Sequence, residues 1–187
     1  MPTSPASING LPTPTRRQVI TVGALAFGGL GIGFAADVGA SPDEISRSAE
    51  AIHQEPQIPA SRARIYRALT DARQFDRMVR LSAAVKEMAI TPKPVVLEAR
   101  LGGAFSAFGG YITGRFIELL ADELIVQAWR AGGWSPGIYS IARFQLIEQT
   151  SGTKVLFDHT GFPVGQAEHL AQGWHDNYWD PLRALFK

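Results

Sequence analysis

The last segment of the chain, residues 166–187, gathers the side-chain types that most often perform chemistry. It combines His169 and His175 with three carboxylates, two tryptophans and a tyrosine. Two histidines four residues apart on a helix can hold one metal ion. These two are six apart, about 120° around a helix, so a straight helix cannot bring both to one ion. We therefore predict that the pair binds no metal, and we expect no cofactor.

The apolar side chains of the same segment follow a helical spacing. In one continuous helix, Leu170, Trp174, Tyr178 and Leu185 lie on one side and form an apolar stripe. Such a stripe is more often packed core than a ligand cage. A helix laid across a curved antiparallel sheet can nevertheless leave a cavity beneath its aromatic side chains. His169 is expected on the opposite, solvent-facing side.

Two residues of this segment are unusual inside a helix. Pro181 follows Asp180, and proline removes a helical hydrogen bond except at the first position after a cap. We expect the helix to kink or restart there. Gly173 costs about 1 kcal/mol in a helix interior, so we expect another part of the backbone to approach it closely.

His159 is the one titratable side chain on an otherwise apolar strand face. Alternation along a strand turns every second side chain inward. Two interpretations of His159 stay open: a histidine bonded to a backbone carbonyl near the sheet end, or a group that orients a polar ligand or acts as acid and base. The side chains expected to point inward are Val155, Phe157 and His159 on one strand and Ala142, Phe144 and Leu146 on another.

The elements that must position these residues are short helices followed by strands. Apolar runs separated by glycine pairs are typical of antiparallel hairpins. With the closing helix, this order predicts an α+β domain whose helices cover one face of a sheet. The ranges are two helices within 60–81, turns at 102–103 and 109–110, and strands at about 124–130, 138–148 and 153–160.

Composition narrows the function classes. The chain has 187 residues, of which 45% are hydrophobic and 19% charged, with a net charge of +1. Such a chain can bury a core and is not a polycationic nucleic-acid binder. It contains no cysteine, which excludes disulfides, thiolate zinc sites and a cysteine nucleophile.

The first forty residues have the layout of an export signal. Arg16 and Arg17 precede the uncharged run 19–36, and small residues lead up to Ala40. The arginine pair resembles a twin-arginine signal. We therefore expect recognition by the twin-arginine export machinery, cleavage after Ala40, and a periplasmic or extracellular protein.

The alternative is a membrane anchor formed by residues 19–36, whose length is at the lower limit for a span. In either case residues 1–40 stand apart from the rest. We divide the chain into a signal at 1–40, a linker at 41–50 and a folded domain at 51–187.

A series of glycines, aromatics and polar residues stands in a specific order between Ala51 and Lys187. Its members are Gly102-Gly103 before Phe105, Gly114 ahead of Phe116 and Glu118, Trp129, Ser140 with Phe144 and Leu146, Gly152-Thr153, His159 with Gly161 and Pro163, and Gly173-Trp174. This series resembles the activator of heat-shock-protein-90 ATPase homologue-like family of the START-like, or SRPBCC, superfamily.

The resemblance implies a helix-grip fold, in which a curved antiparallel β-sheet wraps around a long C-terminal helix and encloses an apolar cavity. The chain departs from the family in lacking a tryptophan after the N-terminal helices, where Phe75 or Met78 stands. Together with the helical stripe, the resemblance predicts a set of ligand-cavity side chains. They are Phe116, Trp129, Phe144, Phe157, His159, Trp174 and Tyr178.

Three functions compete. The favoured one is an exported START-like domain that binds a small hydrophobic molecule, because no catalytic triad order, metal spacing or phosphate loop is visible. The second is a hydrolase or cyclase that uses His159 as acid or base. The third is a chaperone ATPase activator-like interaction module, whose cytosolic partner an exported protein would not meet. The balanced charge of residues 41–187 predicts no nucleic-acid partner.

Overall fold

The computed structural model describes residues 49–88 and 93–187. The predicted export signal with Arg16 and Arg17, and the alternative anchor at 19–36, lie outside these residues. Among the helices that are described, none is both long and apolar enough to cross a membrane.

The described strands form one antiparallel sheet in the order β1-β8-β7-β6-β5-β4-β3, with β2 also pairing with β8. From β3 onward each strand pairs with the next along the chain, so the predicted meander is confirmed. The strands are β1 (Ala49–Gln54), β2 (Gln57–Ile58), β3 (Val96–Leu97), β4 (Ala104–Ala107), β5 (Ile112–Leu120), β6 (Leu124–Ala131), β7 (Ser140–Gln149) and β8 (Gly152–Pro163).

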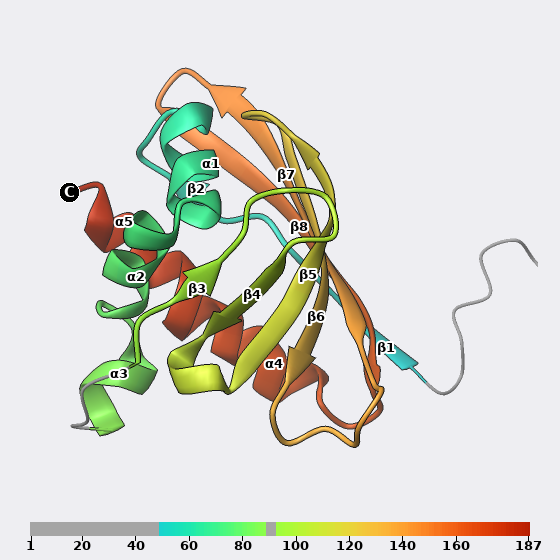
Figure 1. The fold of residues 1–187 in the computed structure, drawn as a ribbon. Helices are drawn as coiled ribbons and strands as arrows, with labels where there is room; N and C mark the ends of the chain where they lie inside the picture. The colour runs from blue at the N-terminus through green and yellow to red at the C-terminus, as the bar shows by residue number, and fades with distance from the viewer. Residues whose placement is uncertain (1–48, 89–92) are drawn as a thin grey trace, which may run out of the picture. The chain divides into compact units, whose positions relative to one another are not determined.

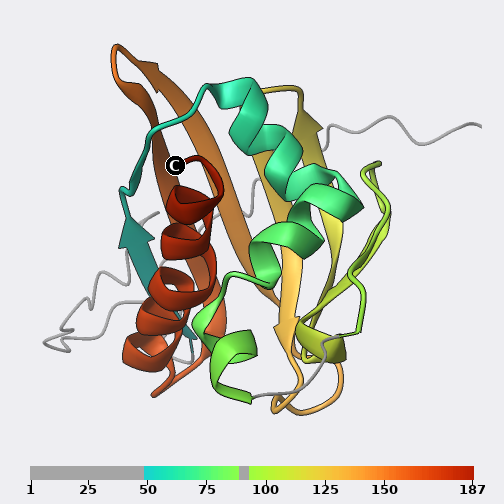
Figure 2. The ribbon, with the colours of Figure 1, turned by 90° about the vertical axis from the view of Figure 1, so that its left-hand side faces the viewer.

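The helices lie on one face of this sheet. Figure 1 shows the strands curving around the C-terminal helix, and Figure 2 shows the N-terminal helices beside that helix on the same face. The fold is therefore the helix-grip α+β fold. The helices are α1 (Arg62–Thr70), α2 (Ala72–Val79), α3 (Ala83–Met88), the short η1 (Phe108–Gly110), α4 (Ala167–Trp174), the π-helix η2 (His175–Trp179) and α5 (Asp180–Leu185).

The boundary between α1 and α2 follows from one capping residue. The Asp71 carboxylate accepts a hydrogen bond from the Gln74 backbone N–H at 3.0 Å, which satisfies a donor at the start of α2. Ile65 and Met78 are buried, and α1 contacts β7 whereas α2 contacts η2 and α5. The spacing of apolar residues predicted α1 and α2, whereas α3 was not expected.

The inward faces of the two longest strands carry the expected side chains. Burial alternates along β7 and β8. Because neighbouring strands are in register, Phe144 lies opposite Phe157 and Ala142 lies opposite His159. The predicted inward set is therefore confirmed, and it forms the floor on which the C-terminal helix packs.

The C-terminal helix contains a π-turn that redirects its apolar face. The Asp180 backbone N–H donates to the His175 carbonyl, five residues back, and Pro181 has no N–H to continue the ordinary pattern. The extra residue turns Trp179 and Leu182 into the core, where they are 1% and 0% exposed. Leu185, which was also expected on the stripe, is partly buried and packs against the core.

Gly114 is the tightest glycine position beside the aromatic core. A Cβ built there would collide with the Ala128 carbonyl oxygen and the Phe105 ring. We predict that Gly114→Ala lowers the free energy of unfolding by about 2 kcal/mol, because the strands must separate to admit the methyl group. Urea denaturation measures this. Gly133→Ala is the matched control, since a Cβ there meets only the Tyr111 hydroxyl at 3.9 Å; equal loss in both variants would contradict the prediction.

Candidate functional site

A cavity of about 410 Å³ lies between the C-terminal helix and one end of the sheet. We call it the sheet–helix cavity. Its walls are mostly apolar and come from α3, η1, β5, β6, α4 and η2, with polar groups at Gln166, His169 and Asn177. Because His169 is exposed and also borders the cavity, the cavity reaches the surface at the α4 end.

Three of the seven predicted ligand-cavity residues line this space: Trp129, Trp174 and Tyr178. The ring centroids of Trp174 and Tyr178 are 4.3 Å apart, and those of Trp129 and Trp174 are 5.5 Å apart. β6 positions the first residue, and α4 and η2 position the other two. Together they form a continuous aromatic wall.

The other four predicted residues lie in the packed interior and do not border the cavity. Phe144 and Phe157 lie under the helix, where the Phe157 ring is 4.4 Å from that of Trp174. Phe116 packs against Phe105, and His159 is fully buried. Trp174 and Trp179 are both buried, with ring centroids 5.9 Å apart, and of the two only Trp174 borders the cavity.

Sequence reasoning missed the wall formed by Phe108 and Ala84. Phe108 adopts a positive φ of 51° and precedes Gly109 and Gly110, whose φ values are also positive. The glycine pair correctly indicated a turn, but nothing in the sequence indicated that the turn directs Phe108 against Tyr178, with ring centroids 5.9 Å apart. Ala84 belongs to the unpredicted helix α3.

Gly173 plays a different part from the expected one. We predicted a close backbone neighbour, but a Cβ at this position would meet no atom within 4 Å. Gly173 borders the cavity instead. The missing side chain therefore leaves part of the cavity open, and the expectation of close approach was wrong.

His159 belongs to a buried hydrogen-bond chain that links the helix to the sheet. The Trp174 indole N–H donates to His159 Nδ1 at 2.9 Å. Nδ1 is thus an acceptor, so the ring proton is on Nε2, which lies 2.6 Å from Ser140 Oγ. The Ser140 hydroxyl in turn donates to the Trp129 carbonyl at 3.1 Å.

This chain makes His159 a structural residue rather than a catalytic base. Its Nε2 already carries a proton and donates it to Ser140, so it cannot take the serine proton. Burial lowers the pKa of His159 to about 3, which keeps the ring neutral. Neither His159 nor Ser140 borders the cavity. The geometry is therefore inconsistent with the acid–base role considered for His159.

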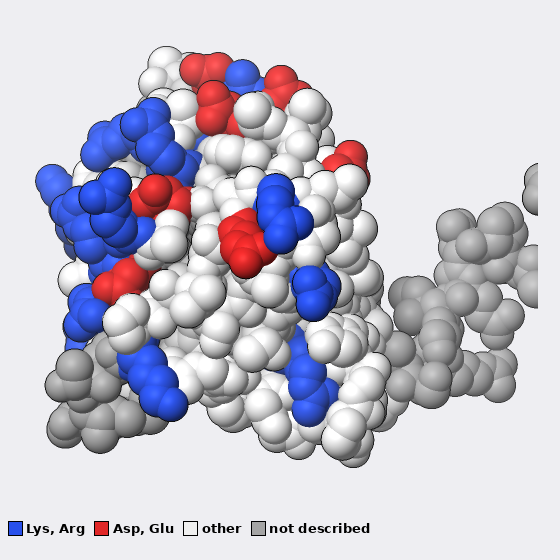
Figure 3. Space-filling model, in the orientation of Figure 1, with Lys and Arg blue, Asp and Glu red and all other residues white. Residues whose placement is uncertain are grey.

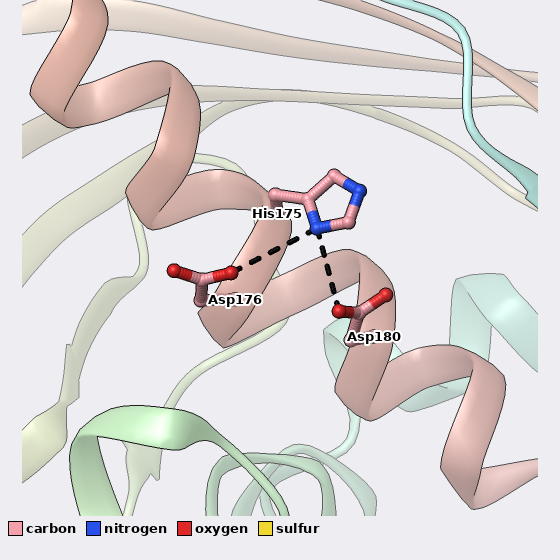
Figure 4. Close-up of side chains that lie close together, drawn as sticks. All are labelled: His175, Asp176 and Asp180. Carbon is pink, nitrogen blue, oxygen red and sulfur yellow. Dashed lines mark ion pairs between the residues drawn. The ribbon is translucent and has the colours of Figure 1, made fainter.

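The helix surface carries a cluster that sequence reasoning did not identify. Figure 4 shows His175 between Asp176 and Asp180, with Nδ1 3.8 Å and 3.3 Å from their carboxylates. Three ligand atoms of this kind within 4.8 Å of one another could hold a cation. However, Arg183 already pairs with Asp180 at 2.9 Å. His169, the other histidine of the segment, is not part of the cluster.

Positive charge gathers over the N-terminal helices. Figure 3 shows many Lys and Arg side chains over α1 and α2, beside a largely uncharged surface over the sheet. Arg64, Arg67 and Arg77 border a hollow of about 250 Å³. The Arg64 guanidinium lies 4.7 Å from the centroid of the Phe186 ring, so part of this charge supports the packing of the C-terminus.

Comparison with known sequences gives a match over most of the described domain. The profile of the family described as "Activator of Hsp90 ATPase homolog 1-like protein" matches residues 59–187. The chain is 30% identical over 98 residues to the human "Activator of 90 kDa heat shock protein ATPase homolog 1", covering 52% of this chain and 29% of that protein. It is 33% identical over 93 residues to "Uncharacterized protein C1711.08" of Schizosaccharomyces pombe, covering 50% and 28%. The chain thus spans less than a third of these relatives.

Solved structures share the fold. An Hsp90 activator from Plasmodium falciparum superposes with a TM-score of 0.60 at 24% identity, covering 74% of this chain and 96% of that one. CalU16 from Micromonospora echinospora superposes with a TM-score of 0.54 at 21% identity, covering 74% and 76%. At these identities the likeness establishes the fold alone.

The buried neutral state of His159 predicts that acid destabilises the fold. Its pKa falls from 6.5 to about 3 on folding, so below pH 6.5 the unfolded chain binds the extra proton. The contribution of His159 leaves the free energy of unfolding unchanged above pH 6.5. Between pH 6.5 and pH 3 it should lower the free energy of unfolding by at most about 1.4 kcal/mol per pH unit. Urea denaturation between pH 7.5 and 5 measures this.

His53 requires a control, because Asp158 and Glu55 raise its pKa and so stabilise the fold as the pH falls. The comparison is therefore made in a His53→Gln background. In that background, His159→Gln should remove the fall in the free energy of unfolding between pH 7.5 and pH 5. A profile that is already flat with His159 present, or an NMR titration of its ring above pH 5, would contradict the prediction.

Proposed function

Because the chain belongs to the activator of Hsp90 ATPase homologue 1-like family, we propose that it uses the family's START-like fold to bind one small hydrophobic molecule in the sheet–helix cavity. The observation that carries this proposal is the cavity itself. Its volume of about 410 Å³ and its aromatic walls match the size and lining of small-molecule sites, which are about 300–1,000 Å³ and mostly apolar.

The surroundings of the cavity support binding rather than turnover. The buried histidine is neutral, fully hydrogen-bonded and outside the cavity. The Asn177 side chain on the cavity wall is also engaged, since it accepts from the Ala84 N–H at 3.0 Å and donates to the Gly173 carbonyl at 3.1 Å. The Asn177 amide thus links α3 to α4 through one accepted and one donated hydrogen bond.

Chaperone activation is a second candidate, because the human relative is named as an activator of the 90 kDa heat shock protein ATPase. Exposed apolar side chains favour a protein contact: Val96 and Leu101 near the β3–β4 end are 60% and 72% exposed. This role requires residence in the cytosol, whereas the twin-arginine-like segment supports export. Localisation therefore separates the two functions.

Filling the cavity at Gly173 tests the ligand proposal. We expect full-length protein purified from its native host to carry a bound apolar compound, detected by native mass spectrometry. Gly173→Leu should abolish this mass, because its side chain enters open cavity space and displaces the ligand. It should not destabilise the fold, since leucine favours a helix by up to about 1 kcal/mol over glycine.

Gln172→Leu is the matched control, because residue 172 is the exposed neighbour on the same helix. It should retain the compound. Equal loss from both variants, or an absence of bound mass in the unaltered protein, would argue against the cavity as the binding site.

A reporter fused to residues 1–45 tests localisation. We expect export that is abolished by the double substitution Arg16→Lys, Arg17→Lys, because the twin-arginine machinery distinguishes the guanidinium pair from two ammonium groups. The single substitutions Arg16→Lys and Arg17→Lys are the controls, and each should reduce export less than the double substitution does. Cytosolic retention of the unaltered fusion would overturn the export proposal and favour the chaperone role.

A further inference from the structure

Four arginine side chains of α1 and α2 have no hydrogen-bond or ion-pair partner within residues 49–88 and 93–187. They are Arg64, Arg67, Arg73 and Arg77. Every other arginine in these two ranges pairs with a carboxylate or donates to a backbone carbonyl. The positive charge that the described chain leaves without a partner is therefore concentrated on one pair of helices.

The acidic side chains of these two helices are already engaged. The segment from Arg62 to Arg80 contains two carboxylates, Asp71 and Asp76. The Asp71 carboxylate accepts from the backbone N–H of Gln74 and caps α2. The Asp76 carboxylate accepts from Arg80 Nε at 2.7 Å and from a backbone N–H of the segment before β3 at 3.2 Å. Neither carboxylate is left to neutralise the four arginines.

Three of the four arginines surround one space, which we call the arginine hollow. Its volume is about 250 Å³, and its walls are Arg64, Arg67, Gln74, Arg77, Leu185 and Phe186. Arg73 lies on the same helix as Arg77 but does not border the hollow. Three like charges around one space repel one another, and a bound anion offsets this repulsion.

The guanidinium groups limit the charge of that anion. Arg64 lies 4.7 Å from the centroid of the Phe186 ring, and this contact engages it in the wall of the hollow. Arg67 and Arg77 then supply two further positive charges. A phosphate monoester carries a charge of about −1.5 to −2 near pH 7 and has three strong acceptor oxygens. It therefore matches two guanidinium forks, whereas a carboxylate would neutralise only one of them.

The apolar part of the wall limits the rest of the molecule. Leu185 and Phe186 are only partly buried and border the hollow beside the charged groups. An inorganic ion would leave this apolar surface uncovered. An organic group attached to the phosphate would cover it and remove it from water.

We propose that the arginine hollow binds a small phosphate monoester. Arg67 and Arg77 hold its phosphate group, and its organic part lies against Leu185 and Phe186. The hollow shares no lining residue with the sheet–helix cavity. It is therefore a second site, and its function is independent of the proposed binding of a hydrophobic molecule.

The test titrates phenyl phosphate into the full chain by calorimetry at pH 7.5 and constant ionic strength. We expect Arg67→Gln and Arg77→Gln each to weaken binding about tenfold, the effect of removing a hydrogen bond to a charged group. Arg73→Gln is the matched control, because it removes the same charge from α2 without changing the hollow. It should change the affinity by less than about twofold, since a charge that does not touch the anion is screened by salt.

Inorganic phosphate is the second probe, because it carries the same charged group without an organic part. Phenyl phosphate should bind at least about threefold more tightly, since its ring covers apolar surface. NMR of the arginine Nε–H groups in the unaltered protein gives a measurement that needs no variant. The Arg67 and Arg77 signals should shift when phenyl phosphate is added, and the Arg73 signal should not.

The contrary outcomes are distinct. Equal weakening by Arg73→Gln and Arg77→Gln would show that the overall charge of the helices attracts phosphate, and this overturns the proposal. Equal affinity for the two probes overturns the assignment of a monoester. Binding that neither Arg67→Gln nor Arg77→Gln alters would place phenyl phosphate elsewhere on the protein. That result, or an absence of binding, overturns the site, while the proposal for the sheet–helix cavity stands.

Discussion

The packing of Trp174 against the sheet is the interaction on which the rest of the structure depends. Its ring contacts Phe157 and Tyr178, and its N–H is bonded to His159 on β8. The same hydrogen bond determines which nitrogen of His159 carries the proton, and through Ser140 it connects the helix to β6. This contact thus joins the C-terminal helix to β8 and gives the buried histidine its structural role, while Gln54 of β1 adds hydrogen bonds to Trp179 and Ala171.

The cavity exists because this packing is uneven along the helix. At the η2–α5 end, the side chains of Trp179 and Leu182 are buried against the sheet and the neighbouring helices. At the α4 end, Gly173 contributes no side chain, and the opposing wall is formed by turn and strand residues rather than by large helical side chains. Close packing in the middle therefore anchors the helix, and open space at one end leaves room for a ligand. This division explains why Phe144 and Phe157 lie in the core while Trp129 faces the cavity.

Hydrophobic periodicity and glycine-pair turns predicted the α+β class and the antiparallel meander, and the family resemblance added the helix-grip arrangement. The alternation on β7 and β8 identified the buried side chains, and the glycine pairs at 102–103 and 109–110 marked turns. Both signals are local, because they depend on residues close together in the chain. The site was less predictable. The ligand-cavity set contained three wall residues but not Phe108, whose direction depends on a positive φ value that its residue type does not favour.

The sequence by itself determined the order of the elements, the inward faces of the strands and the family likeness, since these follow from residue types at regular spacing. The tertiary structure alone decided which aromatic side chains pack and which border open space. The π-turn before Pro181 shifts the helical face by one residue, and α3 adds a wall that has no clear pattern of its own. Whether a buried donor such as the Trp174 indole N–H finds an acceptor is also a tertiary property, because its partner His159 comes from a different element of the chain.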